Sequence, residues 1–236
     1  EVKHFLEKRS IENSKKHQQP ATLNVKSNLD KLTLNDMQVF RFNFRHEKNQ
    51  KILYLHGGYN TLQPSPFHWR LLDKLTLNTL HEVVLPIYPK SPDYHYLETF
   101  KAIRDVYNQL VEEVGANNIV MMGDGSGGGL ALSFVQSLIN DNQEVPRKLF
   151  LLSPLLDATL TNPNITKTLE ENDILVSRFG VHQLMKSWTN DLPLSDARIS
   201  PLYGTLKGLP PIYMYGGGRE ILSPDMHAFT QIGRAS

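Results

Sequence analysis

A glycine-rich run between two apolar segments constrains the fold of this 236-residue chain more than any other feature. The run is Gly123-Asp124-Gly125-Ser126-Gly127-Gly128-Gly129. Upstream, residues 117–122 form a short apolar segment entered from a polar turn, which is typical of a buried parallel strand. Downstream, residues 130–139 contain good helix formers and no Gly or Pro. The pattern therefore predicts a strand, a tight turn and a helix.

Such a turn carries the reactive residue in nucleophile elbows of the form G-x-S-x-G, where the flanking glycines relieve crowding at the bend. In the pattern that begins at Gly123 the central residue is Gly125, and Ser126 stands one place later. Read from Ser126, the flanks are Asp124 and Gly128, so the upstream glycine is absent. Two other interpretations stay open. The turn could bind phosphate at the helix start, although neither common nucleotide-binding spacing is present, or it could simply need a positive φ.

A second glycine motif, His56-Gly57-Gly58-Tyr59, follows the apolar residues 51–55. Sheets of α/β proteins bind ligands at the carboxyl ends of their strands, which is where these glycines are expected. Consecutive glycines let backbone N–H groups turn toward a substrate oxygen, so Gly57 and Gly58 are candidates for an oxyanion hole, joined by Gly127 from the elbow. A purely structural turn is the alternative. His56 is predicted to shape the loop rather than to act as a base.

The two motifs, in this order, resemble those of the hormone-sensitive-lipase-like α/β-hydrolases, whose members carry HGGG followed by GDSAGG. Further matches occur in residues 86–92, 152–157, 199–204 and 208–211, and the resemblance extends from about Leu32 to Asp225. It implies an α/β-hydrolase fold, with a mostly parallel, doubly wound sheet and a helical cap. It also implies that the family's last strand and final helix are missing from these 236 residues.

The expected organisation has four parts: an N-terminal helical cap segment (1–31), the hydrolase core (32–161), a helical cap insertion (162–195) and a continuation of the core (196–236). Within the first parts we expect a helix over residues 2–17, a connecting segment over 20–31 and an antiparallel edge strand over 37–44. The cap insertion carries Phe179, Met185 and Trp188, which could wall an acyl pocket or simply pack in the core.

Aligned with the resembled motif, the family's serine falls on Gly125 and its alanine on Ser126. Glycine has no side chain that can attack a carbonyl carbon. Either the turn shifts by one residue so that Ser126 attacks, or the nucleophile has been lost. Glu220 aligns best with the family's acid, and Asp225 is the second choice. A structural alternative for both is an acid at the start of the next helix.

The family's base is a histidine some tens of residues after the acid, and no histidine of this chain stands at that distance. Only His227 follows Glu220, and it comes too soon, in a segment expected to be helical. A Ser-His-acid triad needs its imidazole within hydrogen-bonding reach of the nucleophile. Other histidines are expected at surfaces or helix caps, namely His68, His81, His95 and His182. Of these, His95 alone is expected near the site.

Composition excludes several classes of function. The length and a hydrophobic content of 40% allow one sizeable core with a small cap. A net charge of +1 with interspersed signs gives no basic field for nucleic acid. The absence of cysteine excludes disulfides and thiol chemistry, and no spacing of Cys, His or carboxylates predicts a metal or cofactor site. No apolar run has transmembrane length, so the compartment stays open: the cytoplasm is the first choice, and a removed leader or anchor is compatible.

Two functions follow from these expectations. The first is a carboxylic-ester hydrolase for small or short-acyl esters, in which Ser126 attacks, the glycine amides hold the oxyanion and Glu220 orients a histidine. The second is a catalytically silent protein of the same fold that binds an ester-like or carboxylate ligand, or nothing. The expected partner is a small-molecule ester. A homodimer is compatible with either function.

Overall fold

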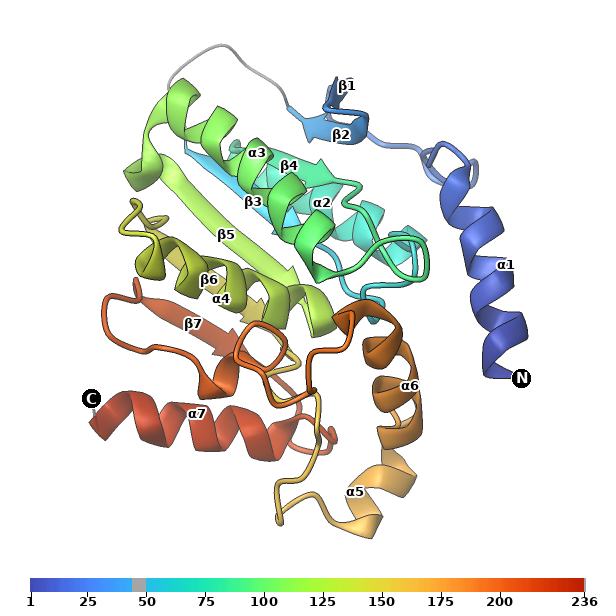
Figure 1. Ribbon diagram of the computed structural model, residues 1–236. Helices are drawn as coiled ribbons and strands as arrows, with labels where there is room; N and C mark the ends of the chain where they lie inside the picture. Colours follow the sequence, from blue (N-terminus) through green and yellow to red (C-terminus); the bar gives the residue numbers. More distant parts are fainter. Residues whose placement is uncertain (44–49, 236) are drawn as a thin grey trace.

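The computed structural model describes residues 1–43 and 50–235 of the chain. A seven-stranded sheet forms its centre, with the strand order β1-β2-β4-β3-β5-β6-β7 (Figure 1). The strands are β1 (Leu29–Leu34), β2 (Met37–Phe42), β3 (Lys51–Leu55), β4 (Glu82–Pro86), β5 (Ile119–Asp124), β6 (Lys148–Leu152) and β7 (Ile212–Tyr215). The helices are α1 (Val2–Ser14), α2 (Pro66–Thr79), α3 (Tyr96–Val114), α4 (Gly125–Asn140), α5 (Lys167–Asn172), α6 (Arg178–Thr189) and α7 (Ser223–Ala235).

The five strands from β3 to β7 pair in parallel, whereas β1 and β2 pair in antiparallel fashion. The mostly parallel, doubly wound sheet expected from the sequence is thus confirmed. One detail was wrong: β2 is antiparallel but is not the edge strand, because β1 pairs along its outer side. Asn35 and Asp36 join these two strands with φ values of 47° and 66°, as a two-residue hairpin turn requires.

Strand β1 escaped the sequence prediction because most of its side chains are exposed, so the segment lacks the apolar alternation of a half-buried strand. Part of it had been assigned to a connecting segment. The predicted N-terminal helix is present and ends at Ser14. Among the helices of the described ranges, none combines the length and apolar character needed to cross a membrane.

Alternation along β3 divides the core between the two faces of the sheet. Leu53 and Leu55 join the larger cluster, which contains buried apolar residues of α3 and α4. Ile52 and Tyr54 join the smaller cluster on the opposite face, together with Trp69 of α2. Figure 1 shows the corresponding layers, with α3 and α4 on one side of the sheet and α2 on the other.

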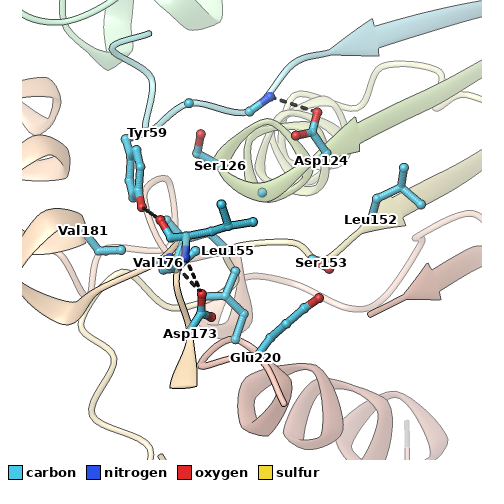
Figure 2. A pocket seen from close by; sticks show the side chains of 15 residues that line it. Tyr59, Asp124, Ser126, Leu152, Ser153, Leu155, Asp173, Val176, Val181 and Glu220 are labelled. Atoms are coloured by element: carbon cyan, nitrogen blue, oxygen red, sulfur yellow. Dashed lines mark hydrogen bonds between the residues drawn. The ribbon is translucent and has the colours of Figure 1, made fainter. Parts of the chain in front are cut away.

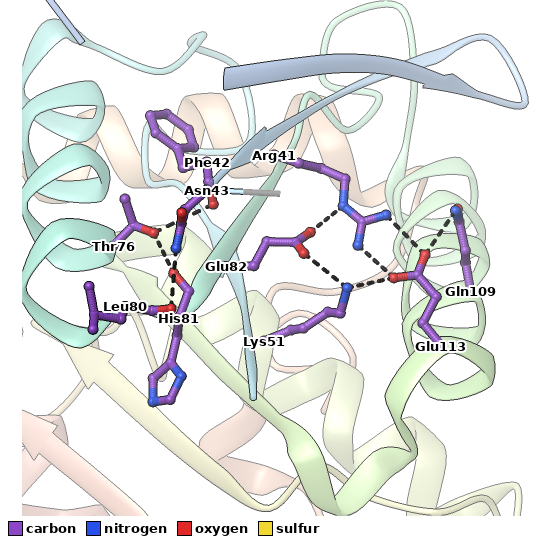
Figure 3. Close-up of polar contacts among 10 residues, drawn as sticks. All are labelled: Arg41, Phe42, Asn43, Lys51, Thr76, Leu80, His81, Glu82, Gln109 and Glu113. Atoms are coloured by element: carbon purple, nitrogen blue, oxygen red, sulfur yellow. Dashed lines mark hydrogen bonds and ion pairs between the residues drawn. The ribbon is translucent and has the colours of Figure 1, made fainter. Parts of the chain in front are cut away.

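Charged side chains cluster at the amino ends of β3 and β4 (Figure 3); Arg41, Lys51 and Glu82 are buried, and Glu113 is half-buried. Lys51 Nζ lies 2.9 Å from Glu82 Oε2 and 2.7 Å from Glu113 Oε2. Arg41 donates to Glu82 and forms a two-pronged contact with Glu113, at 2.9 and 2.6 Å. Burial alone would raise the pKa of Glu113, but hydrogen bonds and charge from Arg41 and Lys51 lower it to about 2. We call these four residues the ionic network.

The segment expected to form a helical insertion contains α5 and α6, joined by a turn over residues 173–177. Both helices lie beyond the carboxyl ends of the parallel strands (Figure 1). Met185 and Trp188 of α6 are buried in the larger core cluster, as core packing would require. Phe179, at the start of the same helix, is 65% exposed. The fold therefore leaves one large aromatic side chain of this insertion in solvent.

Candidate active site

The turn from β5 into α4 has the geometry of a tight strand-to-helix elbow. Gly125 adopts a left-handed φ of 53°, which few residues other than glycine take up readily, and α4 begins at that residue. A Cβ atom added there would come no closer to another residue than 4.0 Å, from Gly57 Cα. Position 125 thus has a special backbone conformation but open space for a side chain.

The neighbouring glycines are needed for a different reason. A Cβ atom on Gly127 would lie 2.2 Å from the carbonyl oxygen of Leu55, and one on Gly123 would lie 2.5 Å from the carbonyl oxygen of Gly127. Both distances are far below van der Waals contact. These two glycines therefore let the start of α4 pack directly against the end of β3.

A cavity of about 370 Å³ opens at the carboxyl ends of β3, β5 and β6. Several of the sequence-predicted site residues line it together: Gly57, Gly58, Asp124, Gly125, Ser126 and Glu220. Figure 2 shows Ser126 and Glu220 at this cavity. The remaining wall is largely apolar and is formed by Tyr59, Leu152, Ser153, Leu155, Asp173, Leu175, Val176, Val181 and Leu222. Gly123, Gly127 and Asp225 do not line it.

Ser126 lies in the first turn of α4 and is 7% exposed. Its Oγ accepts a hydrogen bond of 3.3 Å from the backbone N–H of Asn60, in the loop that follows β3. The first backbone N–H groups of a helix have no partner within the helix and carry its positive dipole end. The serine hydroxyl therefore stands where the protein also presents groups suited to a developing negative charge.

Asp124 connects the elbow to the glycine loop after β3. Its Oδ1 accepts hydrogen bonds from the Tyr54 hydroxyl at 2.7 Å and from the Gly57 N–H at 3.0 Å. His68 Nε2 lies 3.0 Å from the same oxygen. Burial by itself would raise the pKa of Asp124, but the bonds from His68, Tyr54 and Gly57 lower it. Asp124 is thus an ionised anchor that fixes the position of Gly57.

Sequence reasoning missed two partners of this anchor. His68 had been expected only at a surface or helix cap. It does cap α2 through Ser65, and its other ring nitrogen reaches Asp124. Tyr54 gave no signal beyond that of a buried strand residue. An aspartate, a tyrosine and a histidine from separate elements meet only once the sheet is assembled, so no local pattern identifies them.

The two candidate acids occupy different environments. Glu220 follows β7 and lines the cavity, and its Oε2 is buried without a hydrogen-bond partner among the described residues. Asp225 belongs to α7, is 1% exposed and accepts a 2.9 Å hydrogen bond from Asn162. Burial raises the pKa of Asp225 to about 6. Of the two carboxyl groups, only that of Glu220 faces the space next to Ser126.

Within the described residues, no histidine lines the cavity. His56 is fully buried, and its Nδ1 lies 2.7 Å from the carbonyl oxygen of Gly57. Burial lowers the pKa of His56 well below its usual value, so the ring is neutral. Three other histidines are bound elsewhere: His95 caps α3, His182 contacts the Thr159 carbonyl and His227 contacts the Ser223 carbonyl.

Comparisons with known proteins agree with this fold. A family model described as α/β-hydrolase fold matches residues 52–235. An esterase of Acinetobacter venetianus is 34% identical over 184 residues, which are 77% of this chain and 60% of the relative. A triacylglycerol lipase of Mycobacterium tuberculosis is 30% identical over 192 residues, which are 81% of this chain and 39% of the relative. The chain therefore spans less than two thirds of either relative.

Among solved structures, a "putative esterase" from Staphylococcus aureus is 64% identical to this chain, with a TM-score of 0.97. The alignment covers 99% of this chain and 79% of that protein. Sequence, fold and relatives thus point to one family. The chain belongs to the α/β-hydrolase fold family, and the relatives compared above carry the names esterase and lipase.

Proposed function

We propose that this protein hydrolyses small or short-acyl carboxylic esters and that Ser126 is its nucleophile. The observation that carries the proposal is the shared cavity of Ser126, the Gly57-Gly58 loop and Glu220. A nucleophile, oxyanion donors and an orienting acid have to border one space for acyl transfer to occur. The mostly apolar wall and the volume of about 370 Å³ suit a short acyl group.

In this proposal Ser126 Oγ attacks the ester carbonyl carbon and transfers its proton to a base. The C–O bond to the alcohol then breaks, and the base returns the proton to the departing alkoxide. Water then attacks the carbonyl carbon of the acyl-serine and gives a proton to the base. The bond to Ser126 Oγ breaks, the base returns the proton to Oγ, and the carboxylic acid is released. The Asn60 N–H, which donates to Oγ in the resting protein, would hold the hydroxyl in place before attack.

The oxyanion would be held by the backbone N–H of Gly58, which lines the cavity, whereas Gly127, the third candidate, does not line it. The Gly57 N–H already donates to Asp124, so we assign Gly57 to positioning the loop. Within the described residues, Gly58 N–H has no protein acceptor and lines the cavity. Preoriented donors of this kind typically contribute a few kcal/mol, about 10²–10³ in rate, to acyl transfer.

Glu220 would orient the histidine that serves as base. Its partnerless Oε2 beside the cavity is free to accept the imidazole N–H. No described histidine lines the cavity, so the base would come from a residue outside the described ones. The assay below therefore includes the protein expressed from its complete native reading frame.

A second candidate is a silent binding protein, and one observation favours it. In an elbow the nucleophile occupies the strained turn position, and here the left-handed residue is Gly125 rather than Ser126. The cavity would then bind an ester or a carboxylate without cleaving it. The backbone N–H groups in the first turn of α4 would bind the oxyanion during hydrolysis or the carboxylate of a bound ligand.

Hydrolysis of p-nitrophenyl acetate and butyrate tests the first candidate. We expect turnover by the protein from the complete reading frame, and a loss of at least about 10³ in kcat/KM for Ser126→Ala. Ser137→Ala is the matched control, since Ser137 lies on the same helix away from the cavity. Turnover that survives Ser126→Ala, or no turnover in any protein, contradicts the proposal. Butyrate binding without turnover supports the second candidate.

A further inference from the structure

One side chain of the first helix contacts the loop that forms a hydrogen bond to Ser126. Asn13 Nδ2 donates to the backbone carbonyl of Thr61, at 2.9 Å, and to that of Ser91, at 3.2 Å. Thr61 follows β3 and Ser91 follows β4, and both residues are fully buried. A single amide group therefore joins three parts of the chain that are far apart in the sequence.

The surroundings of Asn13 fix the orientation of its amide group. The amide nitrogen faces two oxygen acceptors, whereas Oδ1 is buried without a partner among the described residues. Exchanging the two atoms would place Oδ1 against two carbonyl oxygens and would lose both hydrogen bonds. Helix α1 lies at the edge of the molecule and has no buried residue, so its attachment depends on polar contacts such as this one (Figure 1).

A chain of hydrogen bonds leads from Asn13 to the serine of the cavity. Ser91, whose carbonyl accepts from Asn13, donates its own N–H to the Asn60 carbonyl at 2.9 Å. The Asn60 N–H in turn donates to Ser126 Oγ at 3.3 Å. Thr61, the other acceptor for Asn13, is the residue that follows Asn60. Asn13 therefore restrains Asn60 from two directions, through Ser91 and through Thr61.

The restrained segment has a backbone conformation that needs support. Tyr59 and Asn60 have φ values of 57° and 51°, so two consecutive residues with side chains adopt a left-handed conformation. This conformation is unfavourable for a residue with a Cβ atom, and asparagine tolerates it better than tyrosine does. Strained backbone at a functional site persists only where the surrounding structure fixes it. The hydrogen bonds from Asn13 supply part of that support where Asn60 meets Ser126.

We propose that Asn13 is a positioning residue for Ser126. It acts through the loop after β3 rather than on a ligand, because Asn13 does not line the cavity. By holding the Asn60 N–H within reach of Ser126 Oγ, it keeps the serine hydroxyl in one orientation. The restraint on Asn60 does not depend on hydrolysis. Its effect on the reaction rate rests on the function proposed above.

Amide hydrogen exchange, measured by NMR in the protein from its complete reading frame, tests the restraint independently of hydrolysis. Asn13→Ala removes both hydrogen bonds to the loops, and we expect the Asn60 N–H to exchange at least about tenfold faster than in the wild type. Asn118→Ala is the matched control. Asn118 Nδ2 donates to the Val114 carbonyl at 2.9 Å, at the amino end of β5 and away from the cavity. This variant should leave the exchange of Asn60 unchanged.

Kinetics with p-nitrophenyl butyrate test the consequence for Ser126. Asn13→Ala should lower kcat about 10–10²-fold and leave KM within about twofold, because a misplaced nucleophile slows the chemical step while the cavity wall is intact. Asn118→Ala should keep both constants. Asn13→Asp keeps the size of the side chain but presents oxygen to the Thr61 and Ser91 carbonyls, so its kcat should fall at least as far as that of Asn13→Ala.

An unchanged exchange rate of Asn60 in Asn13→Ala overturns the proposal. So does an equal acceleration in Asn118→Ala or at the amides of β5, since that result assigns the change to general destabilisation. In an active protein, a kcat that both Asn13 variants leave unchanged also overturns it. A wild type without turnover contradicts the proposed function instead. The exchange of Asn60 then decides the role of Asn13: selective acceleration in Asn13→Ala supports the proposal, and its absence overturns it.

Discussion

Polar groups near the two ends of β3 differ in whether they have partners. At its amino end, Lys51 and Arg41 share Glu82 and Glu113 in the ionic network, where each of the four charged groups contacts two others. At the carboxyl-end cavity, Glu220 keeps a buried oxygen without a partner among the described residues. Matched buried charges support folding, whereas an unmatched polar atom beside a cavity is available to a ligand or a second catalytic group.

Asp124 shows that the role of an acid depends on its hydrogen-bond partners rather than on the end of the sheet at which it lies. It lies at the carboxyl end, yet it accepts bonds from Tyr54, Gly57 and His68. Its chemistry thus resembles that of the ionic network, with the difference that it holds a functional loop in place. A buried acid near a site is therefore assigned a structural role when its oxygens have several hydrogen-bond partners, and a role toward a ligand when an oxygen has none.

Glu82→Gln is expected to have the largest effect on stability. The substitution keeps the shape of the side chain but removes the negative charge that Arg41 and Lys51 share. Breaking a buried ion pair on one side costs about 3–5 kcal/mol. Urea denaturation should show a loss in this range. A loss below about 1 kcal/mol would show that the ionic network does not support the fold as described.

Two glycine substitutions at the elbow should differ in their cost. Gly127→Ala places a methyl group 2.2 Å from the Leu55 carbonyl oxygen, and we expect a loss of about 3 kcal/mol from overpacking against the backbone. Gly125→Ala meets only the left-handed backbone penalty of about 1–2 kcal/mol. Thermal or urea unfolding of the two variants checks the order. Equal losses would mean that the elbow and β3 are less closely packed.

Asp225→Asn should change how stability depends on pH. Because burial raises the pKa of Asp225 to about 6, the folded state favours the protonated carboxyl group. Its stabilising contribution is complete below the ordinary pKa near 4 and is lost as pH rises through about 6. Relative to the Asn variant, the wild type should therefore lose about 2–2.5 kcal/mol between pH 4 and pH 7. A difference that is constant with pH would contradict this.

Glu220→Gln is the counterpart of Glu82→Gln and should have the smallest effect on stability. Its Oε2 has no partner to lose, so we expect a change within about 1 kcal/mol in the same urea experiment. Hydrolysis by the complete protein should nevertheless fall, since the orienting charge is gone. A stability loss as large as that of Glu82→Gln would place Glu220 with the structural acids.

The sequence was most informative where a local pattern has a local cause. The strand, glycine turn and helix around Gly125 follow from apolar periodicity and from the one residue that takes up a left-handed φ freely. The same holds for His56-Gly57-Gly58 after β3. Because both turns lie at the carboxyl ends of adjacent parallel strands, their meeting at one cavity could also be predicted.

What could not be predicted depends on contacts between distant segments. The ties from Tyr54 and His68 to Asp124 join three elements, and neither residue stands out in its own segment. Strand β1 was missed because its side chains remain exposed. The segment between α5 and α6 looks like ordinary core sequence, yet Ile174 and Leu175 are exposed in a turn that is held by hydrogen bonds to Asp173.

The central claim is that Ser126 is the nucleophile of this cavity, and covalent labelling tests it most directly. The protein from its complete reading frame would be treated with a fluorophosphonate ester, and the modified residue located by tandem mass spectrometry. We predict one adduct, on Ser126, which an excess of p-nitrophenyl butyrate reduces and Ser126→Ala abolishes. The absence of an adduct, or an adduct on another residue, would contradict the claim and leave the cavity, with Gly125 at its elbow, as a binding site.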